Sequence, residues 1–199
     1  RREASATVPP LEPAAPLFAP GERFYYSWDP YLLALLLTRV AGESLLDLFR
    51  RRVAEPIGLE PAAWEWGDWG PLDALTSLPG TAVCGGSGFF DRGVSVTARG
   101  MARLGWLYAC GGRWGGRQVL SRAWIEASTQ PQVAAALPCL EPGAWYARLP
   151  GRYGFYWWVN GLDAEGRRLW PSAPAETFAL QGNQDNACFV IPPWGMVVV

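Results

Sequence analysis

Apolar positions recur with a helical period through the first two thirds of the chain and are replaced by short apolar runs near its end. The helical period predicts four helices, at residues 31–40, about 44–54, about 97–109 and 122–128. Polar residues that can cap a helix precede each of them, namely Asp29 (followed by Pro30), Ser44, Ser95 or Thr97, and Ser121. Residues 31–40 are apolar nearly all round, so we expect the first helix to be buried on most faces.

Aromatic and β-branched runs in the last quarter predict strands at 153–159, 178–180, 187–191 and 196–199. The dipeptide Asn160-Gly161, the polar stretch 181–186 and the Pro-Gly stretch 192–195 predict turns between them, the last closing an antiparallel hairpin. The expected fold class is therefore α+β. A helical part at about 29–130 is followed by an antiparallel sheet at about 153–199.

Three further stretches bear on the organisation of the chain. Residues 1–20 are rich in Pro and Ala and predict an extended connection on a surface, leaving 21–199 as one domain. Residues 59–80 lack a period and predict a long loop, whose tryptophans either wall a pocket or pin the loop to the body. The chain starts without Met and ends in an apolar strand with no closing turn, so we expect it to be part of a longer protein and the domain to be incomplete.

Composition excludes several kinds of chemistry. The net charge of -1 gives no electrostatic case for binding nucleic acid, and no apolar run approaches the roughly 20 residues of a transmembrane helix. The absence of His excludes a Ser-His-Asp or Cys-His mechanism within this chain and the usual His-containing zinc sites. All 17 basic residues are Arg, so any catalytic lysine must come from another segment or chain. The four scattered cysteines favour buried thiols, and we expect no cofactor and no metal ion.

Tyr25 and Tyr26 directly precede the first predicted helix. A tyrosine in this position is held by the core while its hydroxyl can face a cleft, which suits a group that transfers protons. From these residues alone, ordinary aromatic side chains at the edge of the core are the preferred interpretation.

Several segments, in order, resemble motifs of the serine β-lactamase-like family, which includes class C β-lactamases, D-alanyl-D-alanine carboxypeptidases and 6-aminohexanoate-dimer-hydrolase-like esterases. The similarity covers nearly the whole chain, and the joint order and spacing of the motifs carry it. The matching segments are Pro20-Gly21-Glu22-Arg23-Phe24-Tyr25-Tyr26-Ser27, Pro56-Ile57-Gly58-Leu59, Ser95 to Gly105, Gly112 to Ser121, Tyr153 to Trp158 and Cys188 to Pro192.

The resemblance implies a β-lactamase/transpeptidase-like fold and cleavage of a small ester, amide or peptide through an acyl-serine. It identifies Tyr26 as the catalytic tyrosine and Trp28 as a substrate-binding position where the family usually has Asn or Ser. It also aligns the segment Leu180-Gln181-Gly182, with Asn183 after it, with the family's third motif, where Gln181 replaces a Ser or Thr. The strand there offers backbone N–H groups to an oxyanion.

The nucleophile motif Ser-x-x-Lys has no counterpart in these residues, so we expect the chain to be inactive by itself. Two interpretations remain open. In the first, the chain is the C-terminal part of an active hydrolase whose front carries Ser-x-x-Lys. In the second, it is a pseudoenzyme that binds a protein partner or assembles with one, as the changes at Trp28 and Gln181 favour. Family resemblance alone points to a secreted or periplasmic location.

Overall fold

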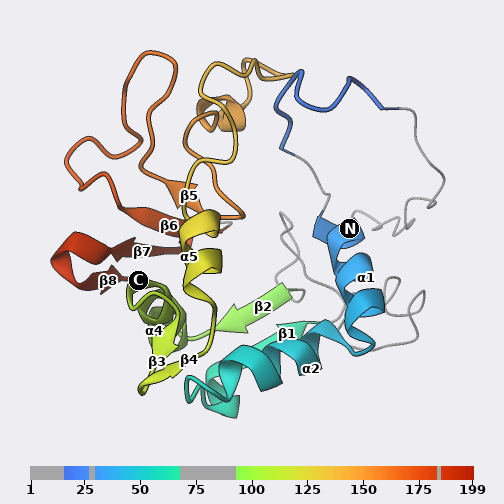
Figure 1. The fold of residues 1–199 in the computed structure, drawn as a ribbon, viewed down its shortest axis with the longest axis vertical. Helices are drawn as coiled ribbons and strands as arrows, with labels where there is room; N and C mark the ends of the chain where they lie inside the picture. Colours follow the sequence, from blue (N-terminus) through green and yellow to red (C-terminus); the bar gives the residue numbers. More distant parts are fainter. Residues whose placement is uncertain (1–15, 27–29, 68–92, 183–184) are drawn as a thin grey trace, which may run out of the picture.

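The structure is a computed structural model and describes residues 16–26, 30–67, 93–182 and 185–199. Helices come first and a four-stranded antiparallel sheet comes last, as the sequence predicts (Figure 1). The main helices are α1 (Pro30–Ala41), α2 (Leu45–Phe49), α4 (Ala98–Ala109) and α5 (Arg122–Ser128). No helix in these ranges is long and apolar enough to cross a membrane.

Side-chain caps begin three of these helices at the predicted positions. The hydroxyl oxygens of Ser44, Thr97 and Ser121 each accept a hydrogen bond of 3.1 Å from a backbone N–H three residues on. Thr97, rather than Ser95, is thus the cap of α4. The second helix continues past Phe49 as a π-helical turn, η1 (Arg50–Ala54), whose three arginines are exposed. Asp29, the predicted cap of α1, lies outside the described residues.

The sheet has the order β5-β6-β7-β8 and is antiparallel throughout. Its strands are β5 (Trp158–Val159), β6 (Phe178–Gln181), β7 (Ala187–Ile191) and β8 (Met196–Val198), and the predicted hairpin of the last two is confirmed. Helix α4 packs on β7 and β8 through Gly105. A Cβ atom there would lie 2.7 Å from Cys188 Sγ, so only glycine allows this approach.

The prediction of a strand over 153–159 is wrong except for its last two residues. Only Trp158 and Val159 pair with β6, and Tyr156 has a φ of +61°, a left-handed conformation that interrupts a strand. Asn160-Gly161 does not form the predicted turn. Asn160 is instead fully buried, and its side chain binds the backbone of residues 170–174.

Part of the predicted loop at 59–80 is a strand. Residues Trp64–Gly67 form β1, which pairs with β2 (Gly93–Val96) in a separate two-stranded sheet. Trp64 and Trp66 pack their rings against Phe49, with centroids 5.2 and 6.0 Å apart. These two tryptophans therefore hold the segment against α2, as the second interpretation expects, whereas Trp69 lies outside the described residues.

Helix α1 is not buried on most faces, contrary to expectation. Ala34 and Thr38 are buried, but one side of the helix is exposed to between 40 and 78% at four apolar residues. These are Leu33, Leu36, Leu37 and Val40. Their spacing of three and four residues places them on a single face, so α1 has an apolar face that the described residues leave uncovered.

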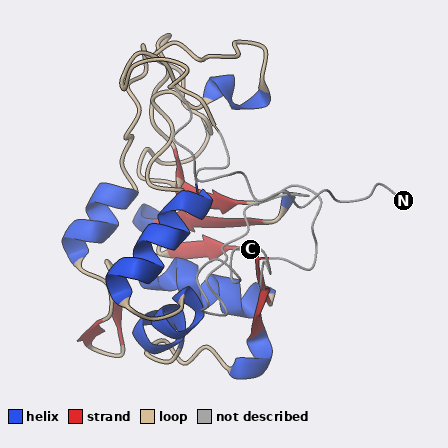
Figure 2. Cartoon of the chain, turned by 90° about the vertical axis from the view of Figure 1, so that its right-hand side faces the viewer, coloured by secondary structure: helices blue, strands red, loops and turns tan. Residues whose placement is uncertain are grey.

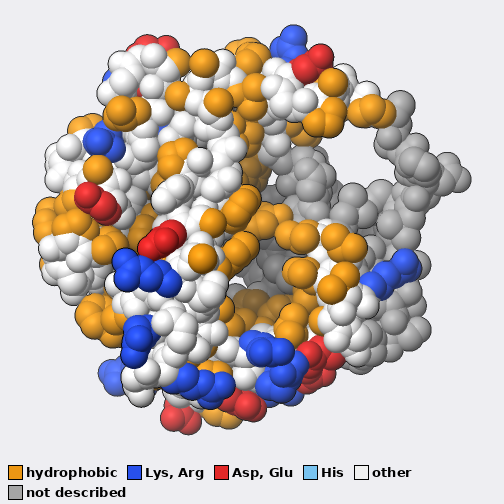
Figure 3. All heavy atoms as spheres, in the orientation of Figure 1, with side chains coloured by type: hydrophobic (Ala, Val, Ile, Leu, Met, Phe, Trp, Pro, Cys, Tyr) orange, Lys and Arg blue, Asp and Glu red, His pale blue; other side chains and the backbone are white. Residues whose placement is uncertain are grey.

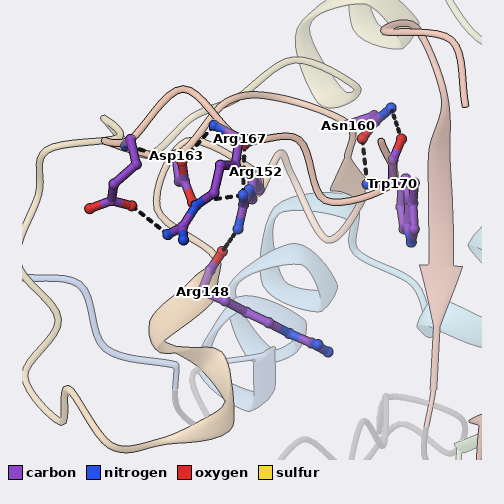
Figure 4. A network of polar contacts seen from close by, with 7 residues as sticks. Arg148, Arg152, Asn160, Asp163, Arg167 and Trp170 are labelled. Atoms are coloured by element: carbon purple, nitrogen blue, oxygen red, sulfur yellow. Dashed lines mark hydrogen bonds and ion pairs between the residues drawn. The ribbon is translucent and has the colours of Figure 1, made fainter. Parts of the chain in front are cut away.

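Irregular segments gather beyond one end of the sheet (Figure 2). A buried ion pair helps to hold them, since Arg152 Nη2 lies 2.8 Å from Asp163 Oδ2 and also donates to the carbonyl of Arg167 (Figure 4). Burial alone would raise the pKa of Asp163, but hydrogen bonds from Arg167 and the charge of Arg152 lower it overall. Of the cysteines, Cys110, Cys139 and Cys188 are free thiols, and burial raises the pKa of Cys188 to about 11.

Candidate active site

Tyr26 is half-buried within a cluster of aromatic side chains. Its ring lies edge-on to Trp145 and to Tyr153, with centroid distances of 5.1 and 5.7 Å, and is stacked on Tyr146 at 6.1 Å. Phe24 anchors the segment, because its backbone N–H donates to the carbonyl of Pro138 and its carbonyl accepts from Leu140. The tyrosine segment is therefore fixed against the irregular stretch around residues 138–140, for which the sequence predicts no regular secondary structure.

Two neighbouring phenols hold their protons more firmly than usual. The pKa of Tyr153 is raised first by burial and then by the charge of, and a hydrogen bond with, Tyr26. The pKa of Tyr146 is also raised, first by burial and then by its hydrogen bond of 2.6 Å to Glu141 Oε2. Both phenols consequently remain neutral at neutral pH.

The segment aligned with the third motif lies at the end of β6. Leu180 and Gln181 pair with Cys188 and Ala187 of β7 on one side. On the other side β5 pairs only with Phe178 and Ala179, so within the described residues this edge is open beside 180–181. An open strand edge presents backbone N–H and C=O groups that can bind a substrate or an oxyanion.

Gly182 is exposed, and its N–H donates to the carbonyl of Asn186 at 2.8 Å, so that amide is already used. Trp28 and Asn183, the other two predicted site residues, lie outside the described residues.

The described contacts connect Tyr26 with β6 through β5. Tyr153 pairs with Trp158 in an isolated bridge, and Trp158 pairs with Ala179 of β6. Tyr26 and the 180–182 segment thus belong to one continuous part of the fold. Two surface cavities of about 360 and 330 Å³ contain none of the predicted site residues, and Arg148 is among the residues that line the second.

The described residues contain no cluster of three or more Cys, Asp or Glu side chains that could hold a metal ion. What the aromatic cluster can do chemically is transfer a proton through Tyr26 and bind a flat ligand on an exposed ring. The second ability comes from Trp145, which is 56% exposed. A tyrosine that acts as a base needs a cation nearby.

The sequence predicts Tyr26 as a site residue, and this stays a prediction, but it does not predict the aromatic residues that surround Tyr26. Trp145 and Tyr146 lie in a stretch without periodicity, and Tyr153 was assigned to a strand. Only the aromatic content of 153–158 and of 145–146 signalled the cluster. The left-handed φ of Tyr156, which interrupts the predicted strand, has no signal in the sequence.

Comparison with known proteins gives consistent results. The family model described as Beta-lactamase matches residues 4–199. A 6-aminohexanoate-dimer hydrolase of Paenarthrobacter ureafaciens is 33% identical over 158 residues, which are 75% of this chain and 36% of that protein. The chain therefore spans little more than a third of this curated relative.

Solved structures show the same fold at lower identity. A beta-lactamase candidate from Bacteroides dorei superposes with a TM-score of 0.63 and 20% identity, covering 92% of this chain and 50% of that one. A penicillin-binding protein homologue from Caulobacter crescentus gives a TM-score of 0.57 and 21% identity, with 92% and 54% covered.

Proposed function

Because the chain belongs to the beta-lactamase family, we propose that it forms part of a serine hydrolase that cleaves an ester or amide through an acyl-serine intermediate. In this proposal Tyr26 transfers the proton of the nucleophile, and a serine followed three residues later by a lysine comes from a further segment. The observation that carries the proposal is the position of Tyr26, half-buried among neutral phenols and connected through β5 to the open edge of β6.

The exposed face of α1 supports the need for a further segment. Four apolar side chains at helical spacing are 40 to 78% exposed, and hydrophobic side chains surround a hollow on the face of the molecule drawn in Figure 3. An exposed apolar helix face is typical of an interface that another element covers. The relatives are about twice as long as this chain, so they have residues enough for such an element.

The proposed chemistry assigns different tasks to neighbouring phenols. A free phenol titrates near pH 10, so Tyr26 needs the charge of the incoming lysine to act as a base at neutral pH. Tyr153 keeps its proton because its pKa is raised, and it can therefore donate a hydrogen bond to the Tyr26 oxygen when that oxygen ionises. Backbone N–H groups at the open edge of β6 then stabilise the tetrahedral intermediate.

Replacing Tyr26 tests the proposal. In the complete protein encoded by the gene, Tyr26→Phe is expected to lower ester turnover by at least about 10²-fold, which is typical of losing a proton-transfer group. The matched control is Tyr25→Phe, because Tyr25 is adjacent to Tyr26, is 39% exposed and packs edge-on against Tyr146. Equal turnover in the two variants would remove Tyr26 from the mechanism.

A second candidate function is a pseudoenzyme that serves as a binding or assembly subunit. The observation in its favour is that Trp28 and Gln181 stand where the family has small polar side chains that contact the substrate. The two functions differ in one feature, namely whether the complete reading frame encodes Ser-x-x-Lys. Absence of ester turnover together with absence of that motif would favour the second.

A further inference from the structure

Next to Tyr26, a short 3-10 helix presents an aromatic ring and a cation to solvent. This helix, η3 (Trp145–Arg148), begins with the exposed Trp145 and ends with the exposed Arg148. In a 3-10 helix, side chains three residues apart are eclipsed, so these two project from the same side. Neither residue lies in a segment that the family motifs cover.

Both side chains are held by the same buried ring. Trp145 stacks on Trp158 with an interplanar angle of 10° and a centroid distance of 5.8 Å. The guanidinium carbon of Arg148 lies 5.3 Å from the centroid of the Trp158 ring. Since Trp158 is only 6% exposed and belongs to β5, it provides a rigid support for both.

The charge of Arg148 is not neutralised within the described part of the chain. No carboxylate there lies within ion-pair distance of it, whereas Arg152 and Arg167 are both paired with Asp163. In Figure 4 the Arg148 side chain extends away from that network, to which it contributes only its backbone carbonyl. A cation–π contact leaves the N–H groups of a guanidinium free to bind a carboxylate.

The acidic group that contacts the aromatic cluster forms no ion pair with Arg148. Glu141 reaches the cluster through Tyr146, whose hydroxyl donates to its carboxylate at 2.6 Å. The Glu141 carboxylate is therefore bound to the Tyr146 hydroxyl and not to the Arg148 guanidinium, which contacts the Trp158 ring. A ligand lying on Trp145 would therefore have a cation within reach, together with Tyr26, whose ring is 5.1 Å from that of Trp145.

We propose that Trp145 and Arg148 form a subsite beside Tyr26 that binds a ligand with a flat apolar group and a carboxylate. The aromatic ring of Trp145 stacks on the flat group, and the Arg148 guanidinium forms charge-assisted hydrogen bonds with the carboxylate. This inference deepens the proposed hydrolase by naming a substrate class, and it rests on that function only for its kinetic consequence.

Equilibrium binding tests the subsite without requiring turnover. The complete protein is titrated with benzoylglycine, which has a benzene ring and a carboxylate, and with its neutral amide, and binding is followed by calorimetry. The carboxylate is expected to bind at least tenfold more tightly than the amide. Arg148→Gln should abolish this preference and Arg148→Lys should retain part of it, because lysine keeps the charge but loses the planar fork.

Two further variants separate the charge and the ring from general effects. Arg122→Gln removes an arginine whose side chain is 82% exposed and is paired with Glu126 on α5, and it should leave both affinities unchanged. Trp145→Leu should weaken both ligands, because the ring that stacks on the benzene is lost. Equal binding of acid and amide by the unaltered protein, or a preference that survives in Arg148→Gln with an unchanged melting temperature, would overturn the proposal.

Kinetics then distinguish failure of the subsite from failure of the hydrolase. The matched substrates are the 4-nitrophenyl monoester of glutaric acid and the 4-nitrophenyl ester of pentanoic acid. Arg148→Gln is expected to lower kcat/KM at least tenfold for the first alone, mainly through KM. If neither ester is cleaved while the carboxylate preference in binding persists, the proposed hydrolase is refuted and the subsite stands.

Discussion

Asn160 offers the most direct test of how the region beside β5 is held together. Its side chain is fully buried, and its amide nitrogen donates to the carbonyls of Trp170, Ala173 and Pro174 at 3.0, 3.2 and 2.9 Å. Its oxygen accepts from the N–H of Trp170 at 2.8 Å. Asn160, which directly follows the strand that supports Trp145, therefore fixes the loop at 170–174.

The cost of removing this amide can be worked out from its partners. In Asn160→Ala the Trp170 N–H loses its acceptor and three carbonyls lose their shared donor. An unpaired buried group costs about 1–3 kcal/mol, but the partner residues are only half-buried and water can reach some of these groups. We expect destabilisation by about 2–4 kcal/mol. Asn160→Asp should cost more, because it turns a charged oxygen toward three carbonyl oxygens.

Urea unfolding of the complete protein, followed by tryptophan fluorescence, measures both variants. Burial among carbonyls raises the pKa of the introduced carboxyl in the folded state. The variant should therefore be most stable at low pH and lose stability as the pH rises, relative to Asn160→Ala. Gln132→Ala is the control, because Gln132 is exposed and its side chain makes one hydrogen bond, to the Ala127 carbonyl. A cost for Asn160→Ala no larger than that of the control would refute this account of the loop.

Three other predictions follow from the same structure. Gly105→Ala places a methyl group 2.7 Å from Cys188 Sγ and 2.8 Å from Val197 Cγ1. The overpacking should cost about 1–3 kcal/mol, which exceeds the gain in helix propensity, so the melting temperature should fall. The control Gly143→Ala meets no atom within 4 Å and should leave the melting temperature unchanged. The pKa of Asp163 is lowered in the folded state, so the carboxylate stabilises the fold above its ordinary pKa, and this stabilisation is lost as the pH falls through the folded pKa. Asp163→Asn should therefore lower the melting temperature at pH 7 and make the melting temperature decline less steeply in acid. An equally steep decline in the variant would contradict this account. Tyr153→Phe removes the proposed donor to Tyr26 and should lower kcat for ester hydrolysis without a comparable change in KM, and a purely raised KM would exclude that role.

Features that depend on neighbouring residues could be predicted from the sequence. Ser44, Thr97 and Ser121 cap helices because a hydroxyl reaches an N–H three residues on, whatever the rest of the fold does. The strands β7 and β8 could also be predicted, because they are two short apolar segments joined by a nearby Pro-Gly bend. Tyr26 could be put forward as a candidate site residue because its motif is contiguous, and its role stays a prediction.

Features that depend on distant partners could not be predicted. The aromatic run 153–157 has strand propensity, but Gly154 packs tightly against the backbone carbonyl of Ser128 at the end of α5, and Tyr156 adopts a left-handed φ. The apolar face of α1 was expected to be buried, since a pattern shows that residues are apolar and not whether a partner covers them. Trp145 reaches Tyr26 from more than a hundred residues away, in a segment without a period.

The central claim is that Tyr26 serves an acyl-serine mechanism in the complete protein, and the rate of acylation tests it most directly. The complete protein is mixed with a 4-nitrophenyl ester and quenched at intervals, and the acyl adduct is located by peptide mass spectrometry. The account predicts an adduct on a serine that lies three residues before a lysine, formed at least about 10²-fold more slowly in Tyr26→Phe than in Tyr25→Phe. The absence of any serine adduct, or equal rates in the two variants, would contradict it.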